Sequence, residues 1–292
     1  LPAIEQLVNK RIHILGVAGT LMGSFAAFLK RSGIQVTGSD QNIYPPMSDI
    51  LKEAGISIFT PFAAENINQA KPDLIIVGNV IRKTNPEMQA VLEKNLTYLS
   101  LPYALETIVL PKKHSIVVAG THGKTTTTSI LAWLMECLNE NPSFCIGGVV
   151  HNFKESFRIT NSKYMIMEGD EYDTAFFDKV PKFTHYLPKD AILTSVEFDH
   201  ADIYADIHAV VSAFDLLAQQ LPHDGFFVVC GEAETPLRIA HGSNATVITY
   251  GLSHSVDSKA SHIEFLKDGC KFRWHFNNTH RVSMKLLGNH NV

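Results

Sequence analysis

The stretch Gly120-Thr121-His122-Gly123-Lys124-Thr125-Thr126-Thr127 decides which fold this 292-residue sequence predicts. It follows an apolar run, residues 115–119, and precedes a helical pattern over residues 124–138. A glycine-rich loop between a strand and a helix indicates phosphate binding, because its backbone N–H groups and the helix dipole attract phosphate oxygens. In such a loop we expect Lys124 to place its charge between the terminal phosphates of a nucleotide and Thr125 to offer a hydroxyl to Mg²⁺. Apolar residues recur on one face of the helical pattern: Ile130, Leu131, Leu134 and Leu138.

This loop departs from the common phosphate-loop pattern at one position, because Val118 stands where the first glycine belongs. The alternative is a Gly-Lys-Thr helix start that arose by chance. The strand before the loop, the amphipathic helix after it and the four successive threonines at residues 125–128 favour phosphate binding. The residues expected to contact the phosphates are Gly120, Thr121, His122, Gly123, Lys124, Thr125 and Thr126.

Strand and helix patterns alternate over the first hundred residues, which predicts a parallel sheet flanked by helices. We expect strands at residues 11–15, 35–39 and 73–77 and helices at residues 20–31 and 87–94. The alternation stops before Pro111-Lys112-Lys113, which has the composition of a linker. The sequence therefore predicts a first α/β domain over residues 1–110.

The alternation restarts after this linker and predicts a second α/β domain over residues 111–292. Its expected strands, besides residues 115–119, are residues 164–167, 191–196, 226–230 and 246–250. Shorter alternating runs that are typical of antiparallel strands follow at residues 263–265, 271–276 and 281–286. Residues 286–292 have the pattern of a strand, a glycine turn and the first residues of a helix, so we expect the natural protein to continue beyond Val292.

Three glycines, Gly16, Gly19 and Gly23, follow the first predicted strand and lead into the first predicted helix. Their spacing does not fit the dinucleotide fingerprint G-x-G-x-x-G, because Ala18 occupies the position of the second glycine. Small residues still let a ligand approach the backbone, and the helix N-terminus favours an anion such as a diphosphate. Asp40, at the end of the second strand, is placed to accept hydrogen bonds from a ribose or a base. A tight strand–helix turn without a ligand explains these glycines equally well.

Acidic residues follow two of the predicted strands of the second domain. Glu168, Asp170, Glu171 and Asp173 come directly after residues 164–167, and such a cluster repels itself unless a cation is present. A solvated acidic loop is the common meaning of a charge run, but the carboxyl ends of parallel strands face the ligand crevice, which favours a metal site. His200, in the run Glu197-Phe198-Asp199-His200-Ala201-Asp202 after the next strand, is expected at the same edge as a metal ligand.

The composition excludes several classes of partner. The net charge of -4 and the pI near 6.4 provide no basic surface, so we expect neither nucleic acid nor membrane as a partner. No apolar run approaches the length needed to span a bilayer. The four cysteines match no zinc or redox spacing, which favours reduced thiols and a cytoplasmic location.

Together these segments resemble the Mur ligase family, which builds the peptide of bacterial cell-wall precursors. The segments that carry the resemblance are GVAGTLMG (16–23), VTGSD (36–40), NPE (85–87), GTHGKTTT (120–127), EGDEYD (168–173), EFDHADIY (197–204) and LGNHN (287–291). The resemblance covers the whole chain. It implies an N-terminal Rossmann-like UDP-sugar domain, a central P-loop ATPase-type domain with a small antiparallel β extension, and a C-terminal Rossmann-like domain beyond residue 292.

The resemblance also implies an activity, namely an ATP-dependent ligase that uses Mg²⁺ and forms a carbon–nitrogen bond through an acyl phosphate. Lys124, Glu168 and His200 would be catalytic, and Thr125 would join Glu168 and His200 as a metal ligand. Further contacts to ATP are implied for Asn289, His290 and Asn291. The residues implied for the UDP-sugar are Gly16, Ala18, Gly19, Thr20, Met22, Gly23, Asp40 and Arg158.

Within the family, the sequence is most similar to the branch that acts on UDP-N-acetylmuramate. One member of this branch adds L-alanine, and the other adds the tripeptide L-alanyl-γ-D-glutamyl-meso-diaminopimelate during wall recycling. Residues 170–179 (DEYDTAFFDK) and 197–202 (EFDHAD) resemble the tripeptide-adding member, since the alanine-adding member typically has D-E-S-D and E-A-D-H-M-D there. The partners expected from the resemblance are therefore UDP-N-acetylmuramate and the tripeptide, with L-alanine as the alternative acceptor.

Other classes of protein explain only parts of the sequence. A nicotinamide dehydrogenase would explain the first glycine loop but not Lys124 or the acidic cluster. A phosphate-loop switch protein would explain Lys124 but not the N-terminal domain. A non-catalytic nucleotide-sugar-binding fragment is the remaining alternative.

Overall fold

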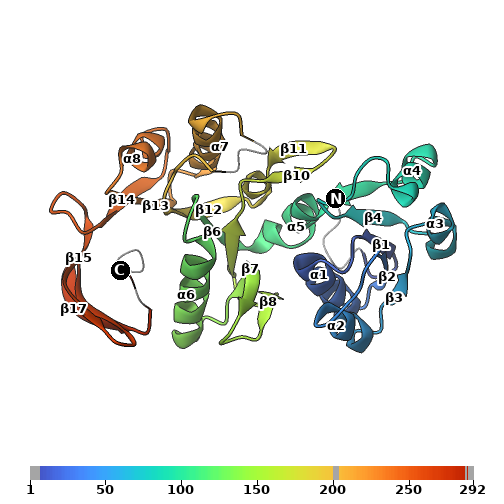
Figure 1. Cartoon of the computed structure of the whole chain (residues 1–292), viewed down its shortest axis with the longest axis horizontal. Helices are drawn as coiled ribbons and strands as arrows, with labels where there is room; N and C mark the ends of the chain where they lie inside the picture. Colours follow the sequence, from blue (N-terminus) through green and yellow to red (C-terminus); the bar gives the residue numbers. More distant parts are fainter. Residues whose placement is uncertain (1–6, 200–203, 287, 289–292) are drawn as a thin grey trace. The chain divides into compact units, whose positions relative to one another are not determined.

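A computed structural model describes residues 7–199, 204–286 and 288 of the chain. They form two compact units of mixed α/β structure, so the predicted fold class is confirmed (Figure 1). Unit 1 contains the described residues of Leu1–Ser115 together with Thr127–Leu187, and unit 2 contains Ile116–Thr126 and the described residues of Pro188–Val292. Among the helices of these described ranges, none is long and apolar enough to cross a bilayer.

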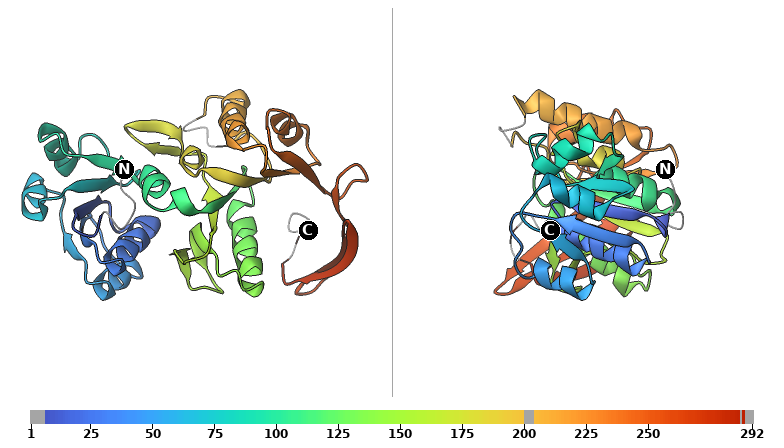
Figure 2. Two further views of the ribbon diagram at one scale, coloured as in Figure 1. Left: turned by 180° about the vertical axis from the view of Figure 1, so that it is seen from behind. Right: turned by 90° about the vertical axis from the view of Figure 1, so that its right-hand side faces the viewer.

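Unit 1 contains a five-stranded sheet with the order β3-β2-β1-β4-β5, in which all pairings are parallel. Its strands are β1 (Arg11–Leu15), β2 (Gln35–Ser39), β3 (Ser57–Phe59), β4 (Leu74–Val77) and β5 (Tyr98–Ser100). The helices are α1 (Thr20–Arg31), α2 (Met47–Glu53), α3 (Ala64–Ala70), α4 (Pro86–Glu93) and α5 (Leu101–Ile108). Helix α1 contacts α2, and α3 contacts α4, with the strands between the two pairs (Figure 1, Figure 2). This is the doubly wound, Rossmann-like arrangement that the sequence predicts.

Close packing of α1 depends on its glycine. Helix α1 buries Phe25 and Leu29 fully, which fixes it on the sheet. A Cβ atom at Gly23 would lie 2.2 Å from the Met47 sulfur and 2.8 Å from the Val17 carbonyl oxygen. Only glycine therefore allows α1 to approach α2 and the loop after β1 so closely.

The remainder of unit 1 contains three neighbouring strands in the order β9-β7-β8 and a separate two-stranded hairpin. The elements are β7 (Ser143–Val150), β8 (Glu155–Arg158), β9 (Tyr164–Gly169), β10 (Asp173–Ala175), β11 (Asp178–Pro181) and the 3-10 helix η3 (Lys182–His185). Phe157 of β8 packs against Phe25 and Phe28 of α1, with ring centroids 5.9 and 6.1 Å apart. The predicted linker at residues 111–113 includes another 3-10 turn, η2 (Leu110–Lys112).

Only part of the apolar face predicted for α6 (Lys124–Cys137), the helix after the phosphate loop, is packed in the structure, because Leu131 lies against a buried cluster. Leu134 and Leu138 are 54% and 69% exposed, whereas Thr128 and Ala132 are fully buried. Ala132 belongs to an apolar cluster with Phe144 and neighbouring side chains. The prediction was wrong for Leu134 and Leu138 because small side chains, rather than large ones, allow the helix to lie close to the strands.

Unit 2 contains seven strands in the order β17-β16-β15-β14-β13-β12-β6. They are β6 (His114–Ala119), β12 (Pro188–Leu193), β13 (Phe226–Cys230), β14 (Thr246–Gly251), β15 (Ser258–Leu266), β16 (Gly269–Phe276) and β17 (Asn278–Met284), with helices α7 (Ile207–Gln220) and α8 (Glu234–Ala240). The pairings from β12 to β15 are parallel, and those from β15 to β17 are antiparallel. The predicted antiparallel extension is therefore confirmed.

Strand β12 ends earlier than predicted. The apolar pattern suggested a strand as far as Val196, but β12 ends at Leu193. The prediction was wrong at this end because Thr194 and Ser195 use their polar groups to hold the phosphate loop, as described next.

Candidate functional site

The predicted phosphate loop connects β6 to α6, and two of its glycines adopt positive φ angles. Gly120 has a φ of +132° and Gly123 a φ of +78°, a region that side chains disfavour. A Cβ atom at Gly120 would also lie 2.2 Å from the Thr194 hydroxyl oxygen and 2.8 Å from the Ser195 carbonyl oxygen. Glycine is therefore required at position 120 both by the backbone conformation and by the contact with the segment after β12.

That segment, residues 194–197, holds the phosphate loop through hydrogen bonds, and we call it the clasp. The Thr121 N–H donates to the Ser195 carbonyl at 2.7 Å, and the His122 N–H donates to the Ser195 hydroxyl at 3.1 Å. The Thr194 hydroxyl donates to the His122 carbonyl at 2.6 Å. The Glu197 N–H donates to the Thr121 hydroxyl at 2.9 Å, and that hydroxyl in turn donates to the Glu197 carbonyl at 3.2 Å. The clasp thus fixes the loop at successive residues.

Lys124 lies over this loop. Its Nζ donates to the Gly120 carbonyl at 2.7 Å and to the Thr121 carbonyl at 3.1 Å. The half-buried ammonium group is therefore held at the loop's own backbone. A cation fixed beside the loop's backbone N–H groups and the N-terminus of α6 provides the charge distribution that binds the phosphates of a nucleotide.

The acidic cluster begins within β9, at Glu168, and is partly neutralised by lysines of the same unit. Lys182 contacts Asp170 at 2.5 Å, and Lys179 contacts Asp173 at 2.7 Å. The Glu168 carboxylate accepts a hydrogen bond of 2.6 Å from the Gly147 N–H of β7. A bound cation and a solvated loop were the two expectations for these charges, whereas protein lysines are the partners of two of them. Metal binding by Glu168 stays a prediction.

The environment of Glu168 also determines the chemistry of a nearby cysteine. Burial, together with the Glu168 charge, raises the pKa of the Cys145 thiol to about 12. Cys145 therefore remains a protonated, inert side chain at neutral pH, as expected for a structural thiol.

The first glycine loop adjoins a cavity of about 350 Å³ that lies within unit 1. Its lining residues are Gly16, Asp40, Gln41, Phe62, Val80, Ile81, Arg82, Thr84 and Asn85. Two predicted ligand residues, Gly16 and Asp40, are thus brought together at one cavity. The mixture of a cation, amides and apolar side chains suits a ligand that carries both phosphates and a ring.

Asp40 has a structural role that the sequence analysis did not predict. Its Oδ2 accepts from the Ala18 N–H at 2.8 Å, and its Oδ1 accepts from the Gln41 N–H at 2.7 Å. The carboxylate therefore orients the glycine loop beside the cavity. Its predicted bond to a ribose or base is not tested by these contacts.

The other residues predicted for the UDP-sugar occupy different environments. Gly19 and Thr20 are exposed at the start of α1, where a helix N-terminus favours an anion. Met22 and Gly23 are buried in the packing of α1. For these two residues the structure supports a packing role, and a ligand contact stays a prediction.

Arg158 is engaged within the fold. Its Nη2 contacts Glu136 at 2.6 Å and donates to the Pro142 carbonyl at 3.2 Å. Its guanidinium group also lies 5.0 Å from the ring centre of Phe144 and 4.7 Å from that of Phe153. These contacts favour a structural role for Arg158, and its contact with a sugar stays a prediction.

Arg82, Thr84 and Asn85 line the cavity, but the sequence analysis did not assign them to the site. All three follow the end of β4, where the carboxyl ends of parallel strands face the ligand crevice. Their position after a parallel strand could have identified them as candidate ligand-binding residues from the sequence. The predicted residues His200, Asn289, His290 and Asn291 lie outside the described residues.

Two family models match consecutive parts of the chain. The model for the Mur ligase family, catalytic domain, matches residues 11–113, and the model for the Mur ligase middle domain matches residues 118–292. The chain belongs to the Mur ligase family. The predicted resemblance is therefore confirmed.

The chain is similar in sequence to ligases of this family that act on UDP-N-acetylmuramate. The chain is 46% identical over 215 residues to the UDP-N-acetylmuramate–L-alanyl-gamma-D-glutamyl-meso-2,6-diaminoheptandioate ligase of Escherichia coli (strain K12). The matched region covers 74% of this chain and 47% of the relative. It is 30% identical over 288 residues to the UDP-N-acetylmuramate–L-alanine ligase of Clostridium perfringens, covering 98% of this chain and 61% of that protein. The chain thus spans about half the length of the E. coli relative.

A solved Mur ligase structure has the same fold. The UDP-N-acetylmuramate:L-alanyl-gamma-D-glutamyl-meso-diaminopimelate ligase from Neisseria meningitides superposes with a TM-score of 0.89 and 39% identity, covering 97% of this chain and 89% of that one. The murein peptide ligase from Psychrobacter arcticus superposes with a TM-score of 0.85 and 35% identity, covering 97% of this chain and 62% of that one.

The clasp generates a testable prediction at Thr194. Thr194→Val keeps the shape of the side chain but removes the hydroxyl that donates to the His122 carbonyl. Loss of one such hydrogen bond should weaken ATP binding by about fivefold. Calorimetry with a non-hydrolysable ATP analogue measures the effect, and Thr194→Ser, which retains the hydroxyl, is the control. Equal affinities of the two variants would show that the clasp does not position the loop.

Proposed function

We propose that the protein containing this chain is an ATP-dependent ligase that joins the lactyl carboxylate of UDP-N-acetylmuramate to the tripeptide L-alanyl-γ-D-glutamyl-meso-diaminopimelate, in the recycling of cell-wall peptide. The observation that carries the proposal is the 46% identity to the E. coli ligase for this tripeptide, against 30% to the L-alanine ligase of C. perfringens. The segments around Tyr172 and Phe198 support the same choice of acceptor.

We propose two domains for this chain, with the UDP-sugar bound by residues 1–110 and ATP bound by residues 111–292. The cavity beside Gly16 supports the first assignment, because Arg82 provides a cation for a diphosphate and the apolar walls suit a ring. The phosphate loop held by the clasp supports the second. A cytoplasmic location follows from the need for ATP and a nucleotide-activated sugar.

In the proposed reaction, the lactyl carboxylate attacks the γ-phosphorus of ATP, which gives an acyl phosphate and ADP. The amine of the acceptor then attacks the acyl carbon, and inorganic phosphate leaves as the amide forms. Phosphorylation is needed because a carboxylate is a poor electrophile. Catalysis in such transfers consists mainly of positioning and charge neutralisation.

The residues of this chain divide that work. Lys124 neutralises charge on the β- and γ-phosphates, and the loop N–H groups bind their oxygens. Thr125, Glu168 and His200 are the proposed metal ligands, and the oxygen donors of Thr125 and Glu168 are of the kind that Mg²⁺ prefers. Bound Mg²⁺ would supply further positive charge at the transferred phosphate. ATP contacts by Asn289, His290 and Asn291 are part of the same proposal.

The alternative acceptor is L-alanine. The C. perfringens L-alanine ligase is similar over 98% of this chain, but at 30% identity, whereas the N. meningitides tripeptide ligase covers 97% at 39% identity. Both alternatives share the donor, the nucleotide and the acyl phosphate, so they differ only in the amine.

The proposed role of Lys124 predicts that Lys124→Ala lowers kcat/KM by about a thousandfold or more, because a fixed cation at the phosphates is lost. The measurement is ADP release by the full-length protein with both substrates present. Lys267→Ala, which removes an exposed lysine from the turn between β15 and β16, is the matched control. Near-normal turnover of Lys124→Ala at saturating ATP would exclude the role.

The choice of acceptor predicts the outcome of a competition. Full-length protein, UDP-N-acetylmuramate and ATP are incubated with the tripeptide and L-alanine at equal concentration, and the products are separated by mass. The tripeptide product should dominate, because remote groups of a longer acceptor can contribute binding energy to the reaction. Dominance of UDP-N-acetylmuramoyl-L-alanine would identify the alternative activity.

A further inference from the structure

A fully buried carboxylate of unit 1 is hydrogen-bonded to segments next to the cavity and has no part in the chemistry proposed above. Glu87, in the first turn of α4, is 0% exposed. Its Oε2 accepts from the Ser39 hydroxyl at 2.5 Å and lies 3.3 Å from Nε2 of the equally buried His13. Its Oε1 accepts from the Asn66 amide at 2.7 Å and from the Ala63 N–H at 3.3 Å. One side chain thus connects β1, β2, α3 and α4.

Two of these partners, Ser39 and Ala63, are next in sequence to residues that line the cavity. Ser39 precedes Asp40, and its carbonyl accepts from the Gly16 N–H at 2.9 Å. Ala63 follows the lining residue Phe62. Through these hydrogen bonds, Glu87 is linked to three loops that line the cavity, namely those that contain Gly16, Asp40 and Phe62.

The fourth wall is fixed to the same helix. Asn85 lines the cavity, and its side chain accepts from the backbone N–H of Glu87 at 2.9 Å and of Met88 at 3.2 Å, capping α4. The cap and the carboxylate therefore move as one element. Any displacement of α4 would shift this wall together with the partners of Glu87.

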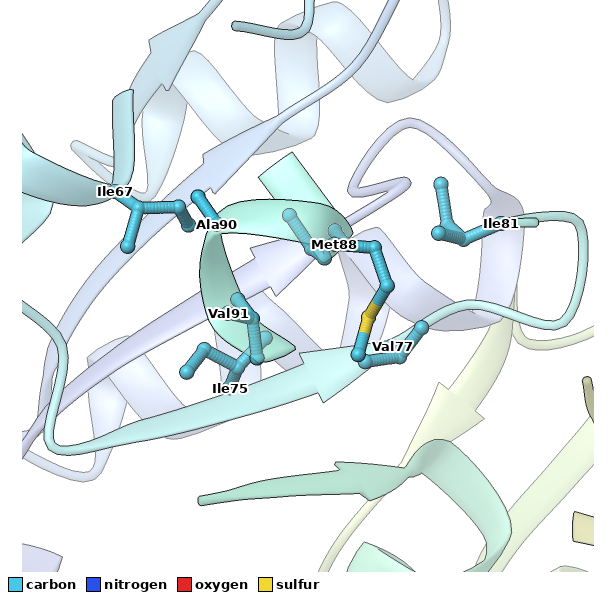
Figure 3. Packing of buried hydrophobic residues seen from close by; sticks show 8 residues of the cluster. Ile67, Ile75, Val77, Ile81, Met88, Ala90 and Val91 are labelled. Atoms are coloured by element: carbon cyan, nitrogen blue, oxygen red, sulfur yellow. The ribbon is translucent and has the colours of Figure 1, made fainter. Parts of the chain in front are cut away.

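An apolar cluster prevents such a displacement. Met88 and Val91 of α4 pack with Ile75 and Val77 of β4, and Ile81, which also lines the cavity, belongs to the same cluster (Figure 3). The carboxylate of Glu87 consequently has a fixed position.

The buried carboxylate of Glu87 is ionised. Burial acts to raise the pKa of Glu87, but hydrogen bonds from His13, Ser39 and Asn66 outweigh it and hold the pKa below its ordinary value. The carboxylate is therefore ionised at neutral pH. Because apolar side chains of similar volume often stabilise a core as well as a buried charge does, a charge with this many partners points to a role in specifying geometry.

We propose that Glu87 is a positioning residue for the nucleotide-sugar substrate, which sets the Gly16 loop, Asp40, Phe62 and Asn85 in the arrangement that binds it. The inference rests on the proposed function of this cavity. Glu87 does not contact the substrate. It acts through Ser39, Ala63 and the cap of α4.

The test is Glu87→Gln in the full-length protein. The amide has the same shape but cannot accept all the hydrogen bonds that converge on the two oxygens. The loops that line the cavity are therefore no longer fixed relative to one another. We expect KM for UDP-N-acetylmuramate, and its Kd by calorimetry, to rise about tenfold or more. The KM for ATP and kcat should stay within about twofold, because the phosphate loop belongs to unit 2. Glu93→Gln, at an exposed position of α4, is the matched control.

A merely structural role would lower the Tm of Glu87→Gln and leave both KM values unchanged in the folded protein, which would overturn the proposal. If Glu87→Gln does not fold, the Ser39→Ala variant tests the positioning role instead. That variant removes the 2.5 Å donor and should raise the KM for the UDP-sugar alone. Unchanged KM in folded Ser39→Ala would equally overturn the proposal. Failure of the wild-type protein to bind UDP-N-acetylmuramate would instead refute the function proposed for the cavity.

Discussion

Hydrogen bonds between a glycine loop and the C-terminal end of a neighbouring strand, or the first residues after it, set the geometry of both candidate sites. In unit 2, the Thr121 N–H donates to the Ser195 carbonyl at 2.7 Å. In unit 1, the Gly16 N–H donates to the Ser39 carbonyl at 2.9 Å, and the Ala18 N–H donates to Asp40 at 2.8 Å. Because these bonds join adjacent parallel strands at their carboxyl ends, each loop is held at the edge where such sheets bind ligands.

The two loops differ in the charged and apolar groups that lie beside them. The loop of unit 2 carries its own cation, Lys124, and leads into the fourteen-residue helix α6, which suits a chain of phosphates. The loop of unit 1 has no lysine and shares its cavity with Arg82 and apolar side chains, which suits a diphosphate joined to a ring. This division matches the two substrates of a ligase that activates a carboxylate with ATP.

Sequence patterns predicted correctly those strands and helices whose bounds are set by neighbouring residues. Strands β1 and β2 and helix α1 have the predicted bounds, because apolar periodicity and glycine punctuation define them. The end of β12 and part of the buried face of α6 were predicted wrongly, since both depend on contacts between distant segments. The same holds for the site: the phosphate loop is visible in its own residues, whereas the Glu87 network joins residues 13, 39, 66 and 87. No spacing rule in a single sequence connects such positions.

We propose that this chain holds two separate nucleotide sites, one at each glycine loop. Calorimetry of residues 1–292 with UDP-N-acetylmuramate and a non-hydrolysable ATP analogue, alone and then in the presence of the other, tests it most directly. Each ligand should bind at a one-to-one ratio whether or not the other is present. Displacement of one ligand by the other, or the absence of UDP-N-acetylmuramate binding, would contradict the claim.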